Sequence, residues 1–320
     1  MQQRSLVAAN DESVNEAARH LRAGRLVALP TETVYGLAAD ATNEDAVMAL
    51  YRIKDRPRFN PLIVHVLDLK KAREIGEFDA LSEALAKRFW PGPLTLVVRR
   101  ARHCPVSKVV SAGLDTVALR VPSHPVMRAV LERAGVPLAA PSANPSGGVS
   151  PTEARHVAEA MGAEIPLILD GGSCRHGVES TVIRVLEGRT LLLRPGAIPR
   201  AEIEAVTGPL VDPNAEEGSS PGRLAGHYAP KTPVRLEATS VDSDECLLAF
   251  GIPIAGHPKA VRNLSLRGDL GEAAANLFGH LRALDKVSCR AIAVMPVPDY
   301  GLGEAINDRL RRAAETSHKR

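Results

Sequence analysis

Short apolar segments alternate with amphipathic segments along the first 210 residues, and this alternation limits the possible folds more than any other feature. Apolar runs of this length, bounded by turn residues, predict strands, here at 26–29, 62–66, 94–98, 117–121, 136–140, 167–169, 181–185 and 191–193. Apolar residues at helical spacing predict helices over 11–22, 43–53, 81–89, 125–133 and 152–161, with Asn43 and Thr152 as N-caps. The mixture indicates an α/β or α+β domain over residues 1–210.

The composition changes between residues 211 and 233, where four prolines and three glycines fall within 23 residues. Such a density of helix and strand breakers predicts a linker. His227 and Tyr228 stand together in it, so the segment is either a plain connection or a linker that also touches a site. Beyond it, strand-like and helical segments alternate again, which predicts a smaller α/β domain over 234–320.

The composition also excludes several classes of protein. Hydrophobic residues make up 45% and charged residues 24% of the chain, as in ordinary globular proteins. The longest near-apolar stretch, 246–256, is far shorter than the roughly 20 residues of a membrane-spanning helix. A net charge of +3 and only 3% aromatic residues disfavour a nucleic-acid surface. The four cysteines form no CxxC pair, which disfavours a zinc site, and their sparseness predicts a reducing, cytoplasmic location.

A basic loop follows the second predicted helix and contains Lys54, Arg56 and Asn60 between stiffening prolines. Arginine offers a planar fork and lysine a point charge, a combination that suits phosphate groups. The alternative is that these cations only complement the dipole at the end of the helix. We favour anion binding for this loop.

Single polar residues also occur in or beside apolar strands. Arg120 lies within the run 117–121, where a buried cation needs either an anionic ligand or a salt bridge. Thr116 begins the same strand and is close enough in sequence to meet the same ligand. Thr33 follows another strand, and His65 lies inside a third; each has an ordinary structural explanation as a turn hydroxyl or a packed histidine.

Small and hydroxyl residues gather in a loop after the strand at 136–140, and this loop includes Ser142, Asn144 and Ser150. Two prolines stiffen it, and its backbone can approach a phosphate closely. Ser180 and Arg194 stand at strand ends and are weak signals alone. Basic and hydroxyl groups dominate this set, without a P-loop, a metal-ligand cluster or a nucleophile–base pair. From the residues themselves we expect a nucleotide-using α/β enzyme that works by positioning and charge stabilisation.

At these same residues the chain resembles the YrdC-like family in its long two-domain form, the threonylcarbamoyl-AMP synthases. The similarity covers nearly the whole chain. It is carried in order by LPTETVYGLAADA (29–41), KDRPRFNPLIVHV (54–66), FWPGPLTLV (89–97), VALRVPSHP (117–125), APSANPSG (140–147), ESTVI (179–183), RPGAI (194–198), the SPG and HYAP segments of the linker (220–230) and GLGEAINDRLRRAA (301–314).

The resemblance implies a twisted α/β domain with a concave basic cavity, a linker over its mouth and a smaller Rossmann-like α/β domain. It implies a nucleotidyltransferase that makes L-threonylcarbamoyl-AMP and pyrophosphate from L-threonine, bicarbonate and ATP, with Mg²⁺. The product would pass to a separate transferase for tRNA modification. Two alternatives stay open: an RNA-binding or ribosome-assembly module without catalysis, and a carbamoyl-adenylate-forming enzyme.

The resemblance also implies roles for individual residues. Lys54 and Arg56 would be catalytic and would hold the ATP phosphates. The further ATP-binding set is Asn60, Thr116, Ser142, Asn144, Ser150, Arg194, His227 and Tyr228. The threonine-binding set is Thr33, His65, Arg120 and Ser180.

Overall fold

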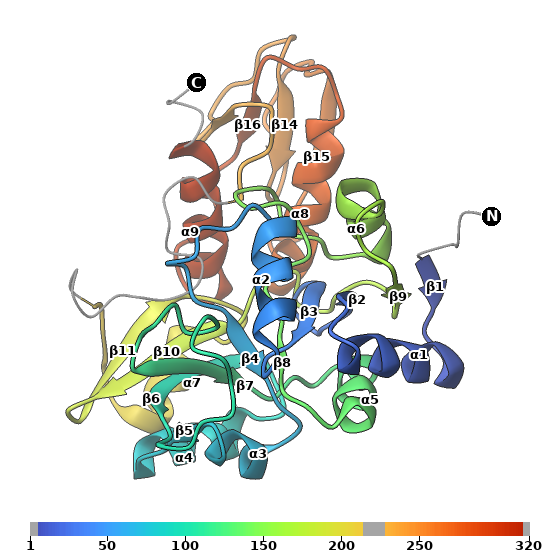
Figure 1. Ribbon diagram of the computed structural model, residues 1–320. Helices are drawn as coiled ribbons and strands as arrows, with labels where there is room; N and C mark the ends of the chain where they lie inside the picture. The colour runs from blue at the N-terminus through green and yellow to red at the C-terminus, as the bar shows by residue number, and fades with distance from the viewer. Residues whose placement is uncertain (1–5, 214–227, 316–320) are drawn as a thin grey trace.

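The computed structural model describes residues 6–213 and 228–315, and their strands form two sheets (Figure 1). The larger sheet has 12 strands in the order β1-β9-β2-β3-β8-β4-β7-β6-β10-β11-β12, with β5 beside β6. These strands are β1 (Leu6–Ala8), β2 (Val27–Leu29), β3 (Gly36–Asp40), β4 (Ile63–His65), β5 (Gly76–Glu77), β6 (Leu94–Arg100), β7 (Thr116–Arg120), β8 (Leu138–Ala139), β9 (Ile168–Asp170), β10 (Thr181–Leu186), β11 (Arg189–Arg194) and β12 (Leu210–Val211).

The helices of this part pack around the sheet and agree with most of the predicted segments. They are α1 (Asp11–Arg22), α2 (Glu44–Ile53), α3 (Leu69–Arg73), α4 (Ala80–Phe89), α5 (Pro125–Ala134), α6 (Ala154–Met161) and α7 (Arg200–Thr207). The predicted cap of α2 is confirmed, since the Asn43 side chain accepts a hydrogen bond from the Ala46 amide. The predicted N-cap of α6 is wrong. Glu153 occupies the N-cap position, and Thr152 lies one residue before it.

Four strands of the large sheet were not predicted, namely β1, β3, β5 and β12, and β3 is the longest of them. β3 pairs antiparallel with β2 on one side and with β8 on the other, so it lies in the middle of the sheet. Its five residues are all buried, and their sequence is Gly36 followed by Leu, Ala, Ala and Asp. A strand that is buried on both faces has no alternation of polar and apolar residues, which is the signal that identifies half-exposed strands.

The smaller part of the molecule is a four-stranded parallel sheet in the order β13-β16-β14-β15, accompanied by two long helices. Its elements are β13 (Val234–Arg235), β14 (Cys246–Ala249), β15 (Ala260–Asn263), β16 (Ile292–Val294), α8 (Leu270–Asp285) and α9 (Leu302–Glu315). Together with the larger sheet, this architecture confirms the predicted fold class of two α/β parts.

The two parts pack directly against each other, and α8 and α9 run down from the small sheet toward the large one (Figure 1). One hydrophobic cluster contains Val34, Val149 and Val178 from the first part together with Phe278 and Ile306 from the second. The approach is closest at Gly177, where an added Cβ would lie 2.4 Å from the carbonyl oxygen of Ala274 in α8. Only a glycine fits there. Together with the shared hydrophobic cluster, this close contact makes the core continuous between the two parts.

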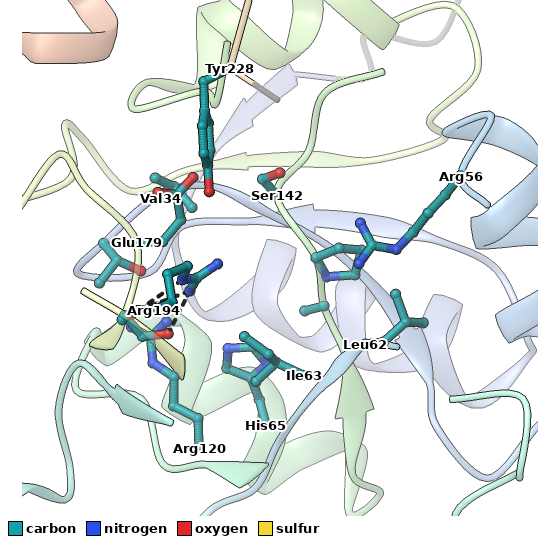
Figure 2. Close-up of a pocket in the computed structure, with 14 residues that line it drawn as sticks. Val34, Arg56, Leu62, Ile63, His65, Arg120, Ser142, Glu179, Arg194 and Tyr228 are labelled. Atoms are coloured by element: carbon teal, nitrogen blue, oxygen red, sulfur yellow. Dashed lines mark hydrogen bonds between the residues drawn. The ribbon is translucent and has the colours of Figure 1, made fainter. Parts of the chain in front are cut away.

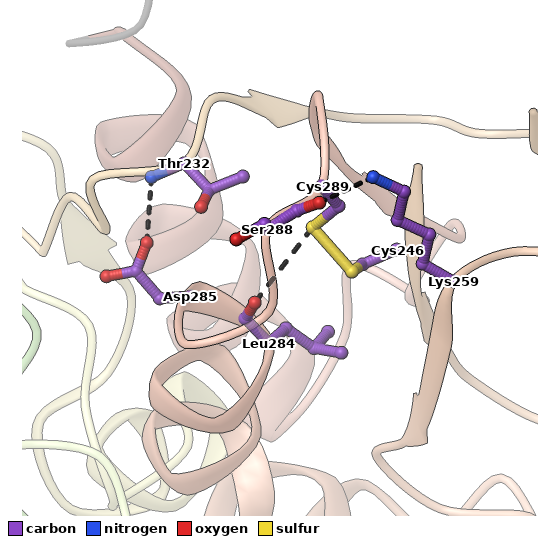
Figure 3. Close-up of a disulfide and its surroundings, with 7 residues drawn as sticks. All are labelled: Thr232, Cys246, Lys259, Leu284, Asp285, Ser288 and Cys289. Carbon is purple, nitrogen blue, oxygen red and sulfur yellow. Dashed lines mark hydrogen bonds between the residues drawn. A yellow bond between two sulfur atoms is a disulfide. The ribbon is translucent and has the colours of Figure 1, made fainter. Parts of the chain in front are cut away.

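Cys246 of β14 and Cys289, 43 residues apart, form a disulfide with a Cα–Cα distance of 5.8 Å (Figure 3). The bond joins a strand of the small sheet to the segment that follows α8. Our sequence analysis took the sparse cysteines as a sign of a reducing compartment, and this pair removes part of the support for that interpretation. Among the residues that the structure describes, no helix has both the length and the apolar character needed to cross a membrane.

Candidate active site

Polar residues predicted from separate parts of the sequence line one buried pocket at the centre of the large sheet (Figure 2). Tyr228 lies above Glu179 and Arg194, His65 and Arg120 lie below them, and Arg56 approaches from the opposite side. The complete lining is Thr33, Val34, Arg56, Leu62, Ile63, His65, Arg120, Ala140, Pro141, Ser142, Glu179, Ser180, Arg194 and Tyr228. The structure therefore brings together eight of the predicted site residues: Thr33, Arg56, His65, Arg120, Ser142, Ser180, Arg194 and Tyr228.

His65 and Arg120 are neighbours because β4 and β7 are parallel and pair in register, with His65 opposite Arg120. Arg120 donates from Nη2 to Glu32 Oε1 over 2.7 Å, and both side chains are buried. Burial raises the pKa of Glu32, but the charge of Arg120 and its hydrogen bond lower the pKa further, to about 2. Burial, followed by the charge of Arg120, lowers the pKa of His65 to about 3. At neutral pH this end of the pocket holds an ion pair beside an uncharged imidazole.

Three polar atoms at this end have no hydrogen-bond partner among the described residues: Glu32 Oε2, His65 Nδ1 and Arg120 Nε. Buried polar atoms are nearly always paired in folded proteins, because an orphaned donor or acceptor costs free energy. A group of such atoms in one pocket therefore marks a position where a ligand supplies the missing partners.

Ser180 is held in place on both sides. Its hydroxyl lies 2.7 Å from that of Thr95, and Arg194 donates from Nη2 to the Ser180 carbonyl and hydroxyl over 2.9 and 3.1 Å. Gly196 packs closely against the start of β10, where an added Cβ would lie 2.4 Å from the Thr181 amide nitrogen. Arg194 thus lines the pocket and also fixes the backbone at the start of β10.

Lys54 does not line the pocket. Its ammonium group donates to the carbonyl oxygen of Ser142 over 2.6 Å and to that of Asn144. Burial, followed by the charge of Arg56, lowers the pKa of Lys54 well below its usual range. In this structure Lys54 therefore ties the end of α2 to the hydroxyl-rich loop, whose backbone also bonds to Tyr35 through the Ala143 amide.

The basic loop places Arg56 firmly at the pocket wall. Its Nε and Nη2 donate to the carbonyl oxygens of Asn60 and Pro61 over 3.1 and 2.8 Å. Burial is the largest of the influences that lower the pKa of Arg56, to about 10, so the side chain stays charged at neutral pH. Asn60 Nδ2 is buried without a partner in the described chain, and Thr116 begins β7 at the end where the basic loop enters β4.

Ser150 and Asn144 are buried beside the pocket but do not line it. Ser150 donates from Oγ to Glu179 Oε1 over 2.6 Å, and Asn144 Nδ2 donates to the carbonyl oxygens of Pro145 and Gly148. His227 and most of the predicted linker, at 214–227, lie outside the described residues. Tyr228, the first described residue after this gap, is buried, and the amide of its neighbour Ala229 donates to the carbonyl oxygen of Gly147.

Sequence reasoning missed two buried carboxylates, namely Glu179, which lines the pocket, and Glu32, which pairs with the lining residue Arg120. Each stands inside a motif that we quoted, next to the residues that we selected. The signal was a single acidic residue in an otherwise buried segment, which requires a cationic partner. No group of three or more histidine, cysteine, aspartate or glutamate side chains that fits a metal ion is present in residues 6–213 and 228–315. Glu32 and Glu179 each form an ion pair with an arginine.

A mixed α/β sheet with a buried pocket of fixed arginines, hydroxyls and unpaired polar atoms defines a protein that binds small, polar, charged ligands. Comparisons with known proteins specify this class further. Residues 19–196 match the family described as "Telomere recombination", which comprises the Sua5, YciO and YrdC proteins, and residues 198–315 match the family "Threonylcarbamoyl-AMP synthase, C-terminal domain".

Two relatives cover almost the whole chain. The threonylcarbamoyl-AMP synthase of Bacillus subtilis (strain 168) is 41% identical over 95% of this chain and 94% of its own length. That of Pyrococcus abyssi is also 41% identical, over 93% of each. The crystal structure of P. abyssi Sua5 complexed with L-threonine superposes with a TM-score of 0.89 at 37% identity, covering 98% of this chain and 97% of that one.

The chain belongs to the threonylcarbamoyl-AMP synthase family. This confirms the resemblance drawn from the sequence motifs, and it makes the protein a nucleotidyltransferase that serves the threonylcarbamoyladenosine modification of tRNA. The two alternatives, an RNA-binding module without catalysis and a carbamoyl-adenylate-forming enzyme, are therefore set aside.

Proposed function

We propose that the pocket holds L-threonine at the end formed by β4 and β7 and ATP toward Arg56 and Tyr228. The observation that carries this proposal is the trio of buried unpaired atoms on Glu32, His65 and Arg120. A free amino acid presents a carboxylate that suits Arg120, and its ammonium and hydroxyl groups suit a carboxylate and a neutral imidazole. Thr33 and Ser180 line the same region and add two hydroxyl groups.

The ATP end is proposed on charge and on the remaining unpaired amides. Arg56 and Arg194 supply two buried cations. The amide atoms Asn60 Nδ2 and Asn144 Oδ1 are buried and have no hydrogen-bond partner among the described residues. Ser142 adds a pocket hydroxyl near the start of the stiff loop. The other residues of the predicted ATP set are Lys54, Thr116, Ser150, His227 and Tyr228, of which Lys54 and Ser150 act here by holding the pocket wall.

The chemistry follows from placing these two ligands side by side. The threonine nitrogen and bicarbonate form a carbamate with loss of water. A carbamate oxygen then attacks the α-phosphorus of ATP, and the bond to the bridging oxygen breaks as pyrophosphate leaves. Negative charge grows on the phosphate oxygens, where the rigidly held guanidinium of Arg56 stabilises it. Burial of the pocket keeps water from the labile mixed anhydride.

Magnesium is proposed only as part of the nucleotide substrate. The described residues offer no carboxylate cluster for a resident ion. Mg²⁺ is commonly held by phosphate oxygens and water with few protein ligands, so it enters as the Mg²⁺–ATP complex. We further propose that the product passes to a separate transferase that acts on tRNA, and that both steps take place in the cytoplasm.

The decisive experiment measures pyrophosphate release from ATP with threonine and bicarbonate omitted in turn. Release that requires both substrates supports the proposal. Valine replaces the threonine hydroxyl with a methyl group of similar size, and we expect it to be rejected by about 10²-fold or more, as in sites that pair a substrate hydroxyl. Release with bicarbonate alone would show that the threonine end is assigned wrongly.

A further inference from the structure

The last helix of the small domain reaches the wall of the active site. Arg309 of α9 is completely buried. It contacts the pocket residue Glu179, which lies 130 residues earlier in the sequence. It donates from Nε to Glu179 Oε2 over 2.9 Å and from Nη1 to the Pro195 carbonyl oxygen over 2.8 Å. Asp308 accepts a further bond from Nη1 over 2.7 Å. Arg309 thus grips the two segments that form one side of the pocket.

Glu179 connects Arg309 to Ser150, one of the residues that the sequence predicts to contact the nucleotide. Its second oxygen, Oε1, accepts the hydrogen bond from Ser150. A carboxylate next to ATP phosphates is unfavourable unless a cation neutralises it. Burial lowers the pKa of Arg309, but Tyr228, Glu179 and Asp308 more than offset this effect and raise it, so the neutralising charge is permanent.

Tyr228 is held by the same domain. The guanidinium carbon of Arg309 lies 5.2 Å from the centroid of the Tyr228 ring, within the range of a cation–π contact. The ring also stacks on Phe278 of α8, with centroids 5.5 Å apart and an interplanar angle of 22°. The phenol that lines the pocket therefore rests on α8 and α9.

We propose that Arg309 is a positioning residue of the active site, which orients Ser150 through Glu179 and holds Tyr228 over the nucleotide. The inference rests on the proposed placement of ATP. It assigns the small domain a specific task, namely to supply the back wall of the nucleotide half of the pocket. The threonine end is built by β4 and β7 and depends on the Glu32 pair instead.

The test uses Arg309→Met and Arg309→Lys in the full-length chain, with Arg311→Met as the matched control. Arg311 lies on the same helix but is exposed. Dissociation constants for ATP and for threonine are measured separately by calorimetry, alongside thermal unfolding. We expect Arg309→Met to weaken ATP binding about tenfold or more, the scale of losing a hydrogen bond between charged groups. Threonine binding should stay within about twofold of wild type.

Arg309→Lys keeps the charge but cannot bond Glu179 and Pro195 with one planar fork. Its ATP affinity should therefore lie between those of wild type and Arg309→Met. If the methionine variant does not fold, the ATP affinity of the lysine variant is compared with that of wild type instead. Equal weakening of ATP and threonine, or unchanged ATP binding in a folded variant, would overturn the inference. Failure of the wild type to release pyrophosphate would count against the proposed function. The dissociation constants for ATP would still test the role of Arg309 in that case.

Discussion

The Arg120 guanidinium and the Glu32 carboxylate, 88 residues apart in the sequence, are joined by a buried hydrogen bond of 2.7 Å. The contact links β7 to the turn after β2, and one polar atom on each side chain remains without a partner in the described chain. The pair neutralises its own charge and still offers an acceptor and a donor. Such a site suits a zwitterion better than a simple anion.

Glu32→Gln tests this interpretation. The amide cannot replace the carboxylate as an acceptor for an ammonium group, so we expect threonine to bind about tenfold more weakly, as for a lost charge-assisted hydrogen bond. ATP binding should change little. Titration calorimetry with each ligand measures both constants, and Glu83→Gln, in the half-exposed pair with Arg73, is the control. Unchanged threonine affinity would remove Glu32 from the threonine end.

His65 predicts a pH dependence of stability. Its pKa is lowered from the ordinary 6.5 to about 3 in the folded chain. Between pH 6.5 and 3 the imidazole binds a proton in the unfolded chain but not in the folded chain. The folded state therefore loses stability relative to the unfolded state as the pH falls through this window. The free energy of unfolding should therefore rise with pH in that window, with a slope of up to about 1.4 kcal/mol per pH unit from this group.

His65→Gln should make that slope shallower by the same amount, whatever its effect on absolute stability. Urea unfolding between pH 4.5 and 6.5 measures the slope. His156, whose pKa is lowered to about 4, remains in the variant and keeps its own share of the dependence. Identical slopes in the two proteins would mean that His65 becomes protonated in the folded state.

Arg56→Ala should lower turnover by about 10²-fold or more, the scale of removing one donor that stabilises developing charge. Arg58→Ala is the matched control, because Arg58 is exposed on the same loop. Steady-state pyrophosphate release gives both rates. Turnover of the Arg56 variant within twofold of wild type would refute its catalytic role.

Lys54→Met separates a loop-holding lysine from a phosphate-binding one. It leaves the Ser142 and Asn144 carbonyl oxygens without their buried donor. Amide exchange over residues 142–148 should therefore speed up even in the absence of ATP. Hydrogen exchange with mass spectrometry reads this loop directly. Unchanged exchange together with weaker ATP binding would instead return Lys54 to the phosphate-binding set.

Removal of divalent cations should abolish pyrophosphate release without loosening the protein. Because Mg²⁺ is proposed to arrive with ATP, chelation should leave both the melting temperature and the threonine affinity unchanged. Differential scanning calorimetry and threonine titration with and without chelator test this. A melting temperature that falls on chelation would indicate a resident ion.

Local signals in the sequence were sufficient for most elements of the fold. The helix at Asp11–Arg22 has the predicted bounds, because an apolar stripe and a capping residue are both local features. β3 was missed because its burial on both faces is set by its neighbours β2 and β8. The cap of α6 was misplaced by one residue, because Glu153 occupies the N-cap position without a side-chain capping hydrogen bond and is not a residue type that marks a helix start.

The site was predictable as a set of residue types but not as a set of contacts. The sequence motifs located Arg120 and Ser180, yet the partners Glu32 and Thr95 lie 88 and 85 residues away. Pairings of that range depend on which strands become neighbours. Lys54 shows the same limit, because its side chain points to a loop that only the assembled sheet brings near it.

The pairing of Arg309 with Glu179 also has a consequence for biosynthesis. A ribosome makes Glu179 130 residues before it makes Arg309. Domains generally fold in order of synthesis, so the first sheet can assemble before Arg309 bonds to this carboxylate. The growing chain would then pass through a stage with a nearly complete pocket whose wall still lacks the Arg309 contact. The half of the pocket that we propose for the nucleotide would be completed only later, when translation delivers α9.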